Sequence, residues 1–344
     1  MTLRVILILV VLVVALAGAA AYQMIQWAEA PVVPDADRPS PKTIRVAEGA
    51  TFQQVAALLE RERLIKSRSA FVLLGKRQDA DRKIHPGEYE FHAAMPPADI
   101  LGKLLTGKVV LHAVTIPEGY TVAQIADVLG QQQITNTAEF LRLSKDSTFI
   151  HSLGVTADSL EGYLYPDTYR LPRPIPAKDL IKTMVEALNQ VYTSEWTARA
   201  QELRLSRHEV LTLASVIEKE TGAKDERPQI SSVFHNRLKK KIPLQSDPTV
   251  IYGLPDFDGN IRKKDLSNPS PYNTYRWPGL PPGPIASPGA QSIKAALYPV
   301  ASSFLYFVSK NDGTHQFSVS LVDHNKAVEK YQKRHGRRSA GSRT

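Results

Sequence analysis

An unbroken run of small and apolar residues opens the chain, from Val5 to Tyr22, and no charged residue follows it before Glu29. This uncharged stretch is long enough to cross a bilayer as a single helix. We therefore predict a transmembrane anchor over residues 5–27, with Trp27 at the membrane–water interface.

The charges before this run indicate its orientation in the membrane, and the small residues within it bear on whether it is cleaved. Arg4 and the free amine precede the run, so the positive-inside rule puts residues 1–4 in the cytoplasm and the bulk of the chain outside it. A cleaved signal peptide is the alternative, because Ala15-Leu16-Ala17 and Ala19-Ala20-Ala21 both resemble cleavage sites. The length of the uncharged run favours an uncleaved anchor.

A repeated pattern follows the anchor. Four prolines between residues 30 and 42 first predict a semi-stiff stalk over residues 28–42. An alternating strand, a Glu-Gly turn, a threonine cap and a helix then occur from Ile44 to Leu59, and again from Val114 to Leu129. With a strand at 85–91 and a helix at 97–106, the first copy predicts a small unit over residues 43–113. The second copy opens a larger domain over residues 114–331.

The candidate chemistry lies at the end of a helix that is apolar nearly all round and is therefore expected to be buried. Ser206 and Glu209 form a capping-box pattern at its start, and Gly222 is typical of the position after its end. Glu218 and Glu220 fall in its last turn, where the helix dipole disfavours negative charge. Burial and dipole both raise a carboxyl pKa, which suits a general acid near neutral pH.

Helical geometry separates the two glutamates. At about 100° per residue they leave the helix roughly 200° apart, so they cannot act as a pair in one pocket. Glu220 continues the row expected to be most buried, and it precedes Thr221, whose hydroxyl can orient a carboxylate. We take Glu220 as the candidate acid. The alternative is that both are solvated charges paired with Lys219, Lys224 or Arg227.

Other patterns predict the remaining elements. We expect helices over 137–153 and 228–240, a turn at Asp247-Pro248 and a short strand over 250–252. Ser287-Pro288 predicts a helix start, and residues 304–319 predict a hairpin turning at 311–313. A last helix is predicted over 324–333, and residues 332–344 are expected to be a disordered basic tail. The fold class is α+β.

Composition excludes several functions. The chain has no cysteine, which excludes disulfides and thiolate metal sites. Its net charge of +9 raises nucleic acid as a partner, but the aromatic residues do not interleave with basic ones, so we predict none. The histidines, including His235, His315 and His324, show no metal-binding spacing. We predict no metal and no cofactor.

Seven blocks spread in order over nearly the whole chain are distinctive. They are Leu160 to Tyr169, Glu218 to Thr221, Ser232 to Leu238, Leu244 to Gly253, Pro271 to Tyr275, Gly279 to Gly283 and the pair His324-Asn325. Together they resemble the endolytic murein transglycosylases of the MltG (YceG-like) family. In that family the glutamate before the threonine is the catalytic acid/base, so the resemblance and the helix geometry both point to Glu220.

The resemblance also implies an activity and a location. It implies a membrane-anchored lytic transglycosylase that cleaves the MurNAc-GlcNAc β-1,4 bond within peptidoglycan strands and leaves 1,6-anhydroMurNAc ends, limiting strand length. It implies an inner-membrane protein with its bulk in the periplasm and peptidoglycan synthases as partners. Residues 43–113 would be a LysM-like module, a strand-helix-helix-strand unit that either holds glycan or serves as a spacer, and residues 114–331 the catalytic domain.

One acid suffices for this reaction if the substrate supplies the nucleophile. Most glycosidases use two carboxylates, and the sequence offers only Asp247 as a second candidate. If the C6 hydroxyl of MurNAc attacks its own anomeric carbon, Glu220 donates a proton to the glycosidic oxygen and takes one from that hydroxyl. Two alternatives remain: a non-catalytic scaffold that binds glycan and recruits wall-synthesis enzymes, and a hydrolytic muramidase with Asp247 or another acid as base.

Polar residues of the matching blocks are candidates for binding substrate or supporting Glu220. Each alone is also typical of a turn or a cap; the set is Glu218, Asn236, Gln245, Ser246, Asp247, Thr249, Tyr252, Tyr272, Asn273 and Thr274. Three tyrosines, Tyr163, Tyr165 and Tyr169, either offer rings for sugar stacking or pack in the core, and a core position is favoured for most of them.

Overall fold

The computed structural model describes residues 3–33, 40–220 and 222–333. Part of the predicted stalk (34–39), Thr221 and the basic tail from 334 onward lie outside the described residues. The described chain contains helices and three two-stranded sheets, β1-β2, β3-β4 and β5-β6, which confirms the predicted mixture of helix and strand. By internal contacts the chain divides into two compact units, residues 1–113 with 170–175, and residues 114–169 with 176–344.

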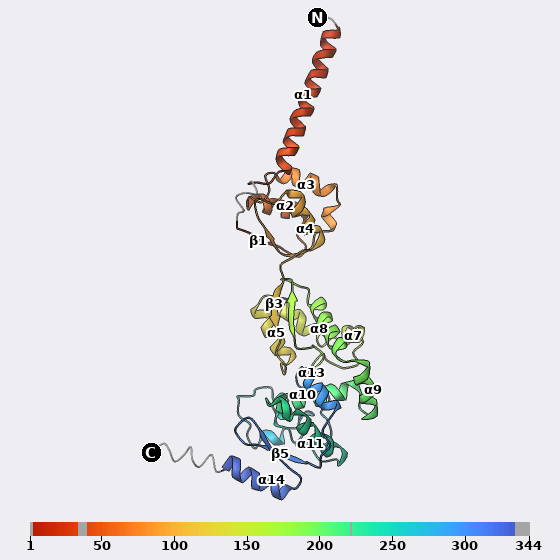
Figure 1. Cartoon of the computed structure of the whole chain (residues 1–344), viewed down its shortest axis with the longest axis vertical. Helices are drawn as coiled ribbons and strands as arrows, with labels where there is room; N and C mark the ends of the chain where they lie inside the picture. Colours follow the sequence, from red (N-terminus) through yellow and green to blue (C-terminus); the bar gives the residue numbers. More distant parts are fainter. Residues whose placement is uncertain (1–2, 34–39, 221, 334–344) are drawn as a thin grey trace, which may run out of the picture. The chain divides into compact units, whose positions relative to one another are not determined.

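Helix α1, Leu3–Glu29, is the apolar N-terminal segment (Figure 1). Over Leu7–Glu29 it is long and apolar enough to cross a membrane, and none of its most apolar stretch is buried against protein. Its final turns contact α3, Arg68–Lys76, and the ammonium of Lys66 lies 5.5 Å from the ring centre of Trp27. By length and composition, α1 fits a single-pass membrane anchor.

The rest of the first unit follows the predicted strand-helix pattern. Strand β1, Lys42–Val46, leads to α2, Phe52–Arg61, then to α3 and to β2, Gly87–Phe91, which pairs antiparallel with β1. Helix α4, Pro97–Thr106, completes it, and β3, His112–Thr115, runs across the boundary between the two units. Helix α2 begins with a capping box between Thr51 and Gln54. The core contains stacked rings of Phe52 and Phe71, 5.3 Å apart, and of Tyr89 and Phe91, 5.6 Å apart.

The second unit opens with the second copy of the repeat. Helix α5, Val122–Gln131, begins with a capping box between Thr121 and Gln124, which matches the one before α2. Gly49 and Gly119 occupy the same turn position in the two copies, with φ of 75° and 76°, a conformation that favours glycine. The predicted repeat is therefore confirmed in the backbone.

The other elements of the second unit are mostly helices. In chain order they are α6 Thr137–Leu143, α7 Ser147–Ser152, β4 Thr168–Leu171, α8 Ala177–Val191, α9 Ser194–Glu202, α10 Arg207–Glu220, α11 Arg227–Lys239, α12 Asp247–Tyr252, α13 Ala290–Leu297, β5 Tyr306–Ser309, β6 His315–Ser318 and α14 Leu321–Val328, which a π-helical turn extends to Lys333. Residues 210–217 of α10 are all buried, and α13 and α11 pack against this helix. The predicted burial of α10 and the hairpin β5-β6 are confirmed.

Two predicted elements have the wrong type or extent. The segment 250–252 is helical, not a strand, because Pro248 suits the first turn of α12 and the hydroxyl of Thr249 donates to the carbonyl of Ser246 at 2.6 Å. The segment 137–153 forms two helices, not one, because the side chain of Asp146 accepts the amide of Phe149 and starts α7 anew.

Two predicted helix starts are shifted. Helix α13 begins at Ala290 because Ser287 exchanges backbone hydrogen bonds with Gly119 and Tyr120, both at 2.8 Å, and so stays extended. Helix α14 begins at Leu321, earlier than predicted, because the hydroxyl of Ser320 caps it.

Two helical glycines of the first unit test its packing. A Cβ at Gly75 would lie 2.1 Å from the ring of Phe52, whereas a Cβ at Gly102 meets nothing within 4 Å. We expect Gly75→Ala to lower the stability of this unit by about 1–3 kcal/mol through overpacking. The matched Gly102→Ala should raise it by about 0.5–1 kcal/mol. Hydrogen exchange of the β1 and β2 amides measures both, and equal protection in the two variants would contradict this packing.

Candidate active site

Helix α10 carries Glu220 to the edge of a cavity. Because the preceding turns of α10 are buried, the position of its last residue is fixed by the core. The half-buried side chain of Glu220 lines a cavity of about 560 Å³, and the hydroxyl of Ser246 donates a hydrogen bond to its Oε1. The volume lies within the range typical of small-ligand sites.

The surroundings of Glu220 bring the pKa of its carboxyl close to neutral pH. Burial raises the pKa of the Glu220 carboxyl to about 7, against the hydrogen bond from Ser246. The carboxylate of Asp247 adds to the rise, and the guanidinium of Arg237 opposes it. A carboxyl that titrates near pH 7 can both give and accept a proton, as a general acid/base requires.

A polar loop positions the Ser246 hydroxyl. Thr274 accepts the amide of Ser246 on its Oγ1 at 3.0 Å and the amide of Gln245 on its carbonyl at 3.1 Å. The hydroxyls of Thr249 and Thr274 lie 2.8 Å apart and both are buried. Gln245 adopts a left-handed backbone, with φ of 53°, which turns the chain into α12. Thr249 and Thr274 therefore support the site without lining the cavity.

The cavity combines residues of the second unit from helices α10, α11, α12 and α14, from the hairpin β5-β6 and from the intervening loops. Its lining consists of Glu220, Arg237, Leu244, Gln245, Asp247, Tyr275, Phe307, Val308, Ser309, His315, His324, Val328 and Gln332. Of the predicted site residues, Gln245 and Asp247 share it with Glu220. The hydroxyl of Tyr275 donates to Asp247 at 2.6 Å, so the second carboxylate is already engaged.

Arg237, which the sequence reasoning did not assign to the site, braces the cavity wall. Its Nη1 donates to the carbonyls of Pro243 and Leu244 at 3.1 and 2.8 Å, and its Nε donates to the carbonyl of Leu305 at 2.6 Å. It thereby ties the loop before Ser246 to the start of β5. His315, also missed, donates from Nδ1 to Glu226 at 2.7 Å. The contact of Arg237 with Leu305 and that of His315 with Glu226 join residues far apart in sequence, so no local pattern indicates them.

Glu218 faces different partners from Glu220, as helical geometry predicts. Its side chain is only 6% exposed and accepts Nη2 of the buried Arg227 at 2.6 Å. Its other oxygen accepts the amide of Gly289 at 3.0 Å, before α13. Glu218 and Arg227 thus form a buried ion pair with a structural role. Pairing with Arg227 was anticipated, but not its burial.

Four predicted site residues lie elsewhere. Asn236 donates to the carbonyls of Ser302 and Phe304, and Asn273 donates to those of Leu266 and Asn268, so both stabilise loops. Tyr252 packs beside Tyr272, with ring centres 4.7 Å apart, and donates to Glu161 at 3.2 Å. None of the four lines the cavity with Glu220.

Glu161 is a second carboxyl with a raised pKa, but its setting is structural. Burial raises its pKa to about 7, and it accepts the amide of Val122 at 3.1 Å, which ties the second repeat to α12. The neighbouring tyrosines Tyr163 and Tyr169 are buried, and their hydroxyls bond to His208 and to the carbonyl of Tyr165. The core interpretation of these two rings is confirmed.

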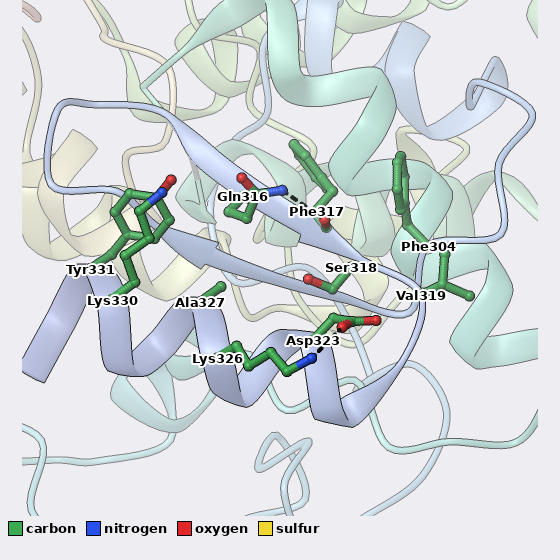
Figure 2. A pocket seen from close by; sticks show the side chains of 10 residues that line it. All are labelled: Phe304, Gln316, Phe317, Ser318, Val319, Asp323, Lys326, Ala327, Lys330 and Tyr331. Atoms are coloured by element: carbon green, nitrogen blue, oxygen red, sulfur yellow. Dashed lines mark hydrogen bonds and ion pairs between the residues drawn. The ribbon is translucent and has the colours of Figure 1, made fainter.

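A second hollow, of about 390 Å³, lies on another face of α14 and is an unsuitable acid site (Figure 2). Its one lining carboxyl, Asp323, has a pKa held below its usual range by a hydrogen bond from Ser320 and by Lys326. It is therefore ionised at neutral pH and cannot donate a proton. Within the described residues, no group of three His, Asp or Glu side chains could hold a metal ion.

Comparison with known proteins identifies the family. Residues 44–330 match the YceG-like family, and the chain belongs to it. It is 37% identical to the endolytic murein transglycosylase of Bacillus subtilis, covering 84% of each chain. It is 32% identical to that of Streptococcus pneumoniae, over 86% of this chain but 59% of the relative. A crystal structure of a YceG-like protein from Listeria monocytogenes matches with a TM-score of 0.59 and 35% identity, over 83% of this chain and 98% of that one.

The charge of Asp247 provides a test of the electrostatics around Glu220. Asp247→Asn removes a like charge, so the ionised form of Glu220 becomes more favourable and its pKa should fall below about 7. Carbon-13 NMR of a chain labelled at the glutamate carboxyls measures the shift, with Asp127→Asn, an exposed residue of α5, as the matched control. A Glu220 pKa that is unchanged or higher in Asp247→Asn would contradict this assignment.

Proposed function

We propose that this chain is an endolytic peptidoglycan lytic transglycosylase with Glu220 as its acid/base. The observation that carries the proposal is a carboxyl poised near neutral pH, held by Ser246 and lining a cavity large enough for sugar residues. Relatives named endolytic murein transglycosylase in Bacillus subtilis and Streptococcus pneumoniae support the same reaction and weigh against a purely non-catalytic scaffold.

The reaction needs two proton transfers at one carboxyl. Protonated Glu220 donates to the glycosidic oxygen between MurNAc and GlcNAc as the bond from C1 to that oxygen breaks. The resulting Glu220 carboxylate then takes the proton of the MurNAc C6 hydroxyl while the oxygen of that hydroxyl forms a bond to C1. The products are a 1,6-anhydroMurNAc end and a free GlcNAc 4-hydroxyl, and Glu220 is again protonated. No water is consumed.

The polar residues around Glu220 serve this chemistry in different ways. Gln245 and Asp247 line the cavity and are proposed to contact substrate. Ser246 opposes full protonation of Glu220, whereas Asp247 opposes full ionisation, so both forms are accessible at neutral pH. The other predicted residues, including Glu218 and Asn273, act through the fold.

The proposal extends to location and biological role. Helix α1 would anchor the protein in the inner membrane with residues 1–4 in the cytoplasm and both units in the periplasm, which the apolar run and Arg4 support. The β1-α2-α3-β2 order supports a LysM-like module over 43–113 that meets the glycan strand. Such an enzyme, near peptidoglycan synthases, would limit the length of nascent strands.

One observation favours a hydrolytic muramidase as second candidate. Asp247 lines the same cavity as Glu220 and is a carboxylate that a water molecule could use as base. Its engagement by Tyr275 at 2.6 Å argues against this role.

A matched pair of glutamate variants tests the acid/base assignment. Glu220→Gln keeps the size and the Ser246 contact but cannot give and retake a proton, so we expect a loss of about 10²–10⁴ in rate. Glu218→Gln should retain activity but be less stable, because the buried Arg227 loses its charged partner. Release of 1,6-anhydro ends from purified glycan strands measures the rate, and thermal unfolding measures stability.

The outcomes discriminate clearly. A fully active Glu220→Gln would remove the enzyme mechanism proposed here. A well-folded but inactive Glu218→Gln beside an active Glu220→Gln would transfer the acid/base role to Glu218.

A further inference from the structure

The pair His324-Asn325 is a distinctive sequence block to which the acid/base mechanism gives no role. His324 lies in the first half of α14, and it lines the same cavity as Glu220. Its neighbours Asp323 and Lys326 belong to the second hollow instead. The helix therefore presents His324, with Val328 one turn later, to the candidate active site.

The imidazole of His324 is held in a fixed stack. It lies on the ring of Tyr306, with ring centres 5.2 Å apart and an angle of 25° between the planes. The guanidinium of Arg237 lies 5.2 Å from the centre of the same Tyr306 ring, and backbone carbonyls fix that guanidinium in turn. The stack limits the freedom of the imidazole before substrate arrives, so less side-chain entropy is lost on binding.

The two ring nitrogens of His324 have different environments. Nδ1 is buried and has no hydrogen-bond partner among the described residues. Nε2 makes no hydrogen bond within the described part of the chain, and the His324 side chain lines the cavity. A buried N–H without an acceptor is rarer in proteins than an unpaired acceptor. The favoured tautomer therefore carries its hydrogen on Nε2.

The ring is also neutral where the enzyme is proposed to work. Burial, together with the nearby charge of Arg237, lowers the pKa of His324 below its usual value. A neutral ring with its hydrogen on Nε2 offers the cavity one donor and no charge. Such a donor matches oxygen acceptors, which a glycan strand carries as N-acetyl carbonyls, hydroxyls and the carboxylates of its peptide stems.

We propose that His324 is a substrate-binding residue whose Nε2–H donates to an acceptor oxygen of the glycan strand bound beside Glu220. The proposal rests on the proposed function for the identity of the strand. In this proposal His324 orients the strand in the cavity, and Glu220 transfers the protons.

Binding measurements in the inactive Glu220→Gln background test this inference apart from catalysis. The probe is a purified glycan oligomer with its peptide stems, titrated by calorimetry into the full chain in detergent. Added to that background, His324→Phe keeps the stacking ring but removes both nitrogens, so we expect Kd to rise about tenfold. His324→Gln places an amide near the Nε2 position and should stay within about threefold of His324. His324→Asn is too short to reach it and should resemble His324→Phe.

The control is His151→Phe, at an exposed residue of α7 and in the same background, which should leave Kd unchanged. Thermal unfolding checks that each variant is folded. Repeating the titration with peptide-stripped strands identifies the acceptor. If His324→Phe still weakens binding of stripped strands, the acceptor is a sugar oxygen. If His324→Phe weakens binding only of strands with their peptide stems, the acceptor is a stem carboxylate. An unchanged Kd in His324→Phe, a His324→Gln as weak as His324→Phe, or an oligomer that does not bind the His324-containing background would overturn the inference. Failure of the proposed function is separate, since it appears as absent cleavage by the unmodified chain.

Discussion

The hydroxyl of Ser246 donates a hydrogen bond to the carboxyl of Glu220, and much of the second unit serves to keep these two groups together. Glu220 is fixed by the buried helix α10, and Ser246 is fixed by Thr274, Thr249 and the first turn of α12. A buried carboxyl alone would stay protonated well above neutral pH, and an exposed one would be ionised. The Ser246 contact moderates the effect of burial, so the pKa of Glu220 is about 7.

Some charges around this contact stabilise the fold, and others set the pKa of Glu220. Arg237 favours ionised Glu220 while its guanidinium binds backbone carbonyls on both sides of the cavity, so one side chain sets both shape and electrostatics. Glu218 and Arg227 form their own buried pair nearby, which keeps a second carboxyl from competing for the site. Asp247 opposes Arg237 and is itself bound by Tyr275. The proposed acid/base, Glu220, thus lies between opposing charges that neither fully ionise nor fully neutralise it.

Features encoded by neighbouring residues could be predicted from the sequence. The repeated threonine caps at Thr51 and Thr121, the apolar pattern of α10 and the hairpin turn near Asn311 are all written in neighbouring residues. The β-branched residues at 250–251 are typical of a strand, but Pro248 and Thr249 favour a helix start there, and the segment is helical. Asn236 and Asn273 have the residue type of a sugar-binding site but stabilise loops instead. Arg237 and His315 escaped prediction because their partners, Leu305 and Glu226, lie roughly 70 and 90 residues away.

The central claim is that one carboxyl suffices because the substrate supplies the nucleophile. Isotope incorporation tests this most directly: purified glycan strands are digested with the full chain in water enriched in oxygen-18, and the new ends are weighed by mass spectrometry. Our account predicts 1,6-anhydro ends that contain no oxygen-18, because no water enters the reaction. Reducing MurNAc ends that carry one oxygen-18 from the earliest time point would show that water is the nucleophile, and would contradict the single-acid mechanism in favour of hydrolysis with a second base.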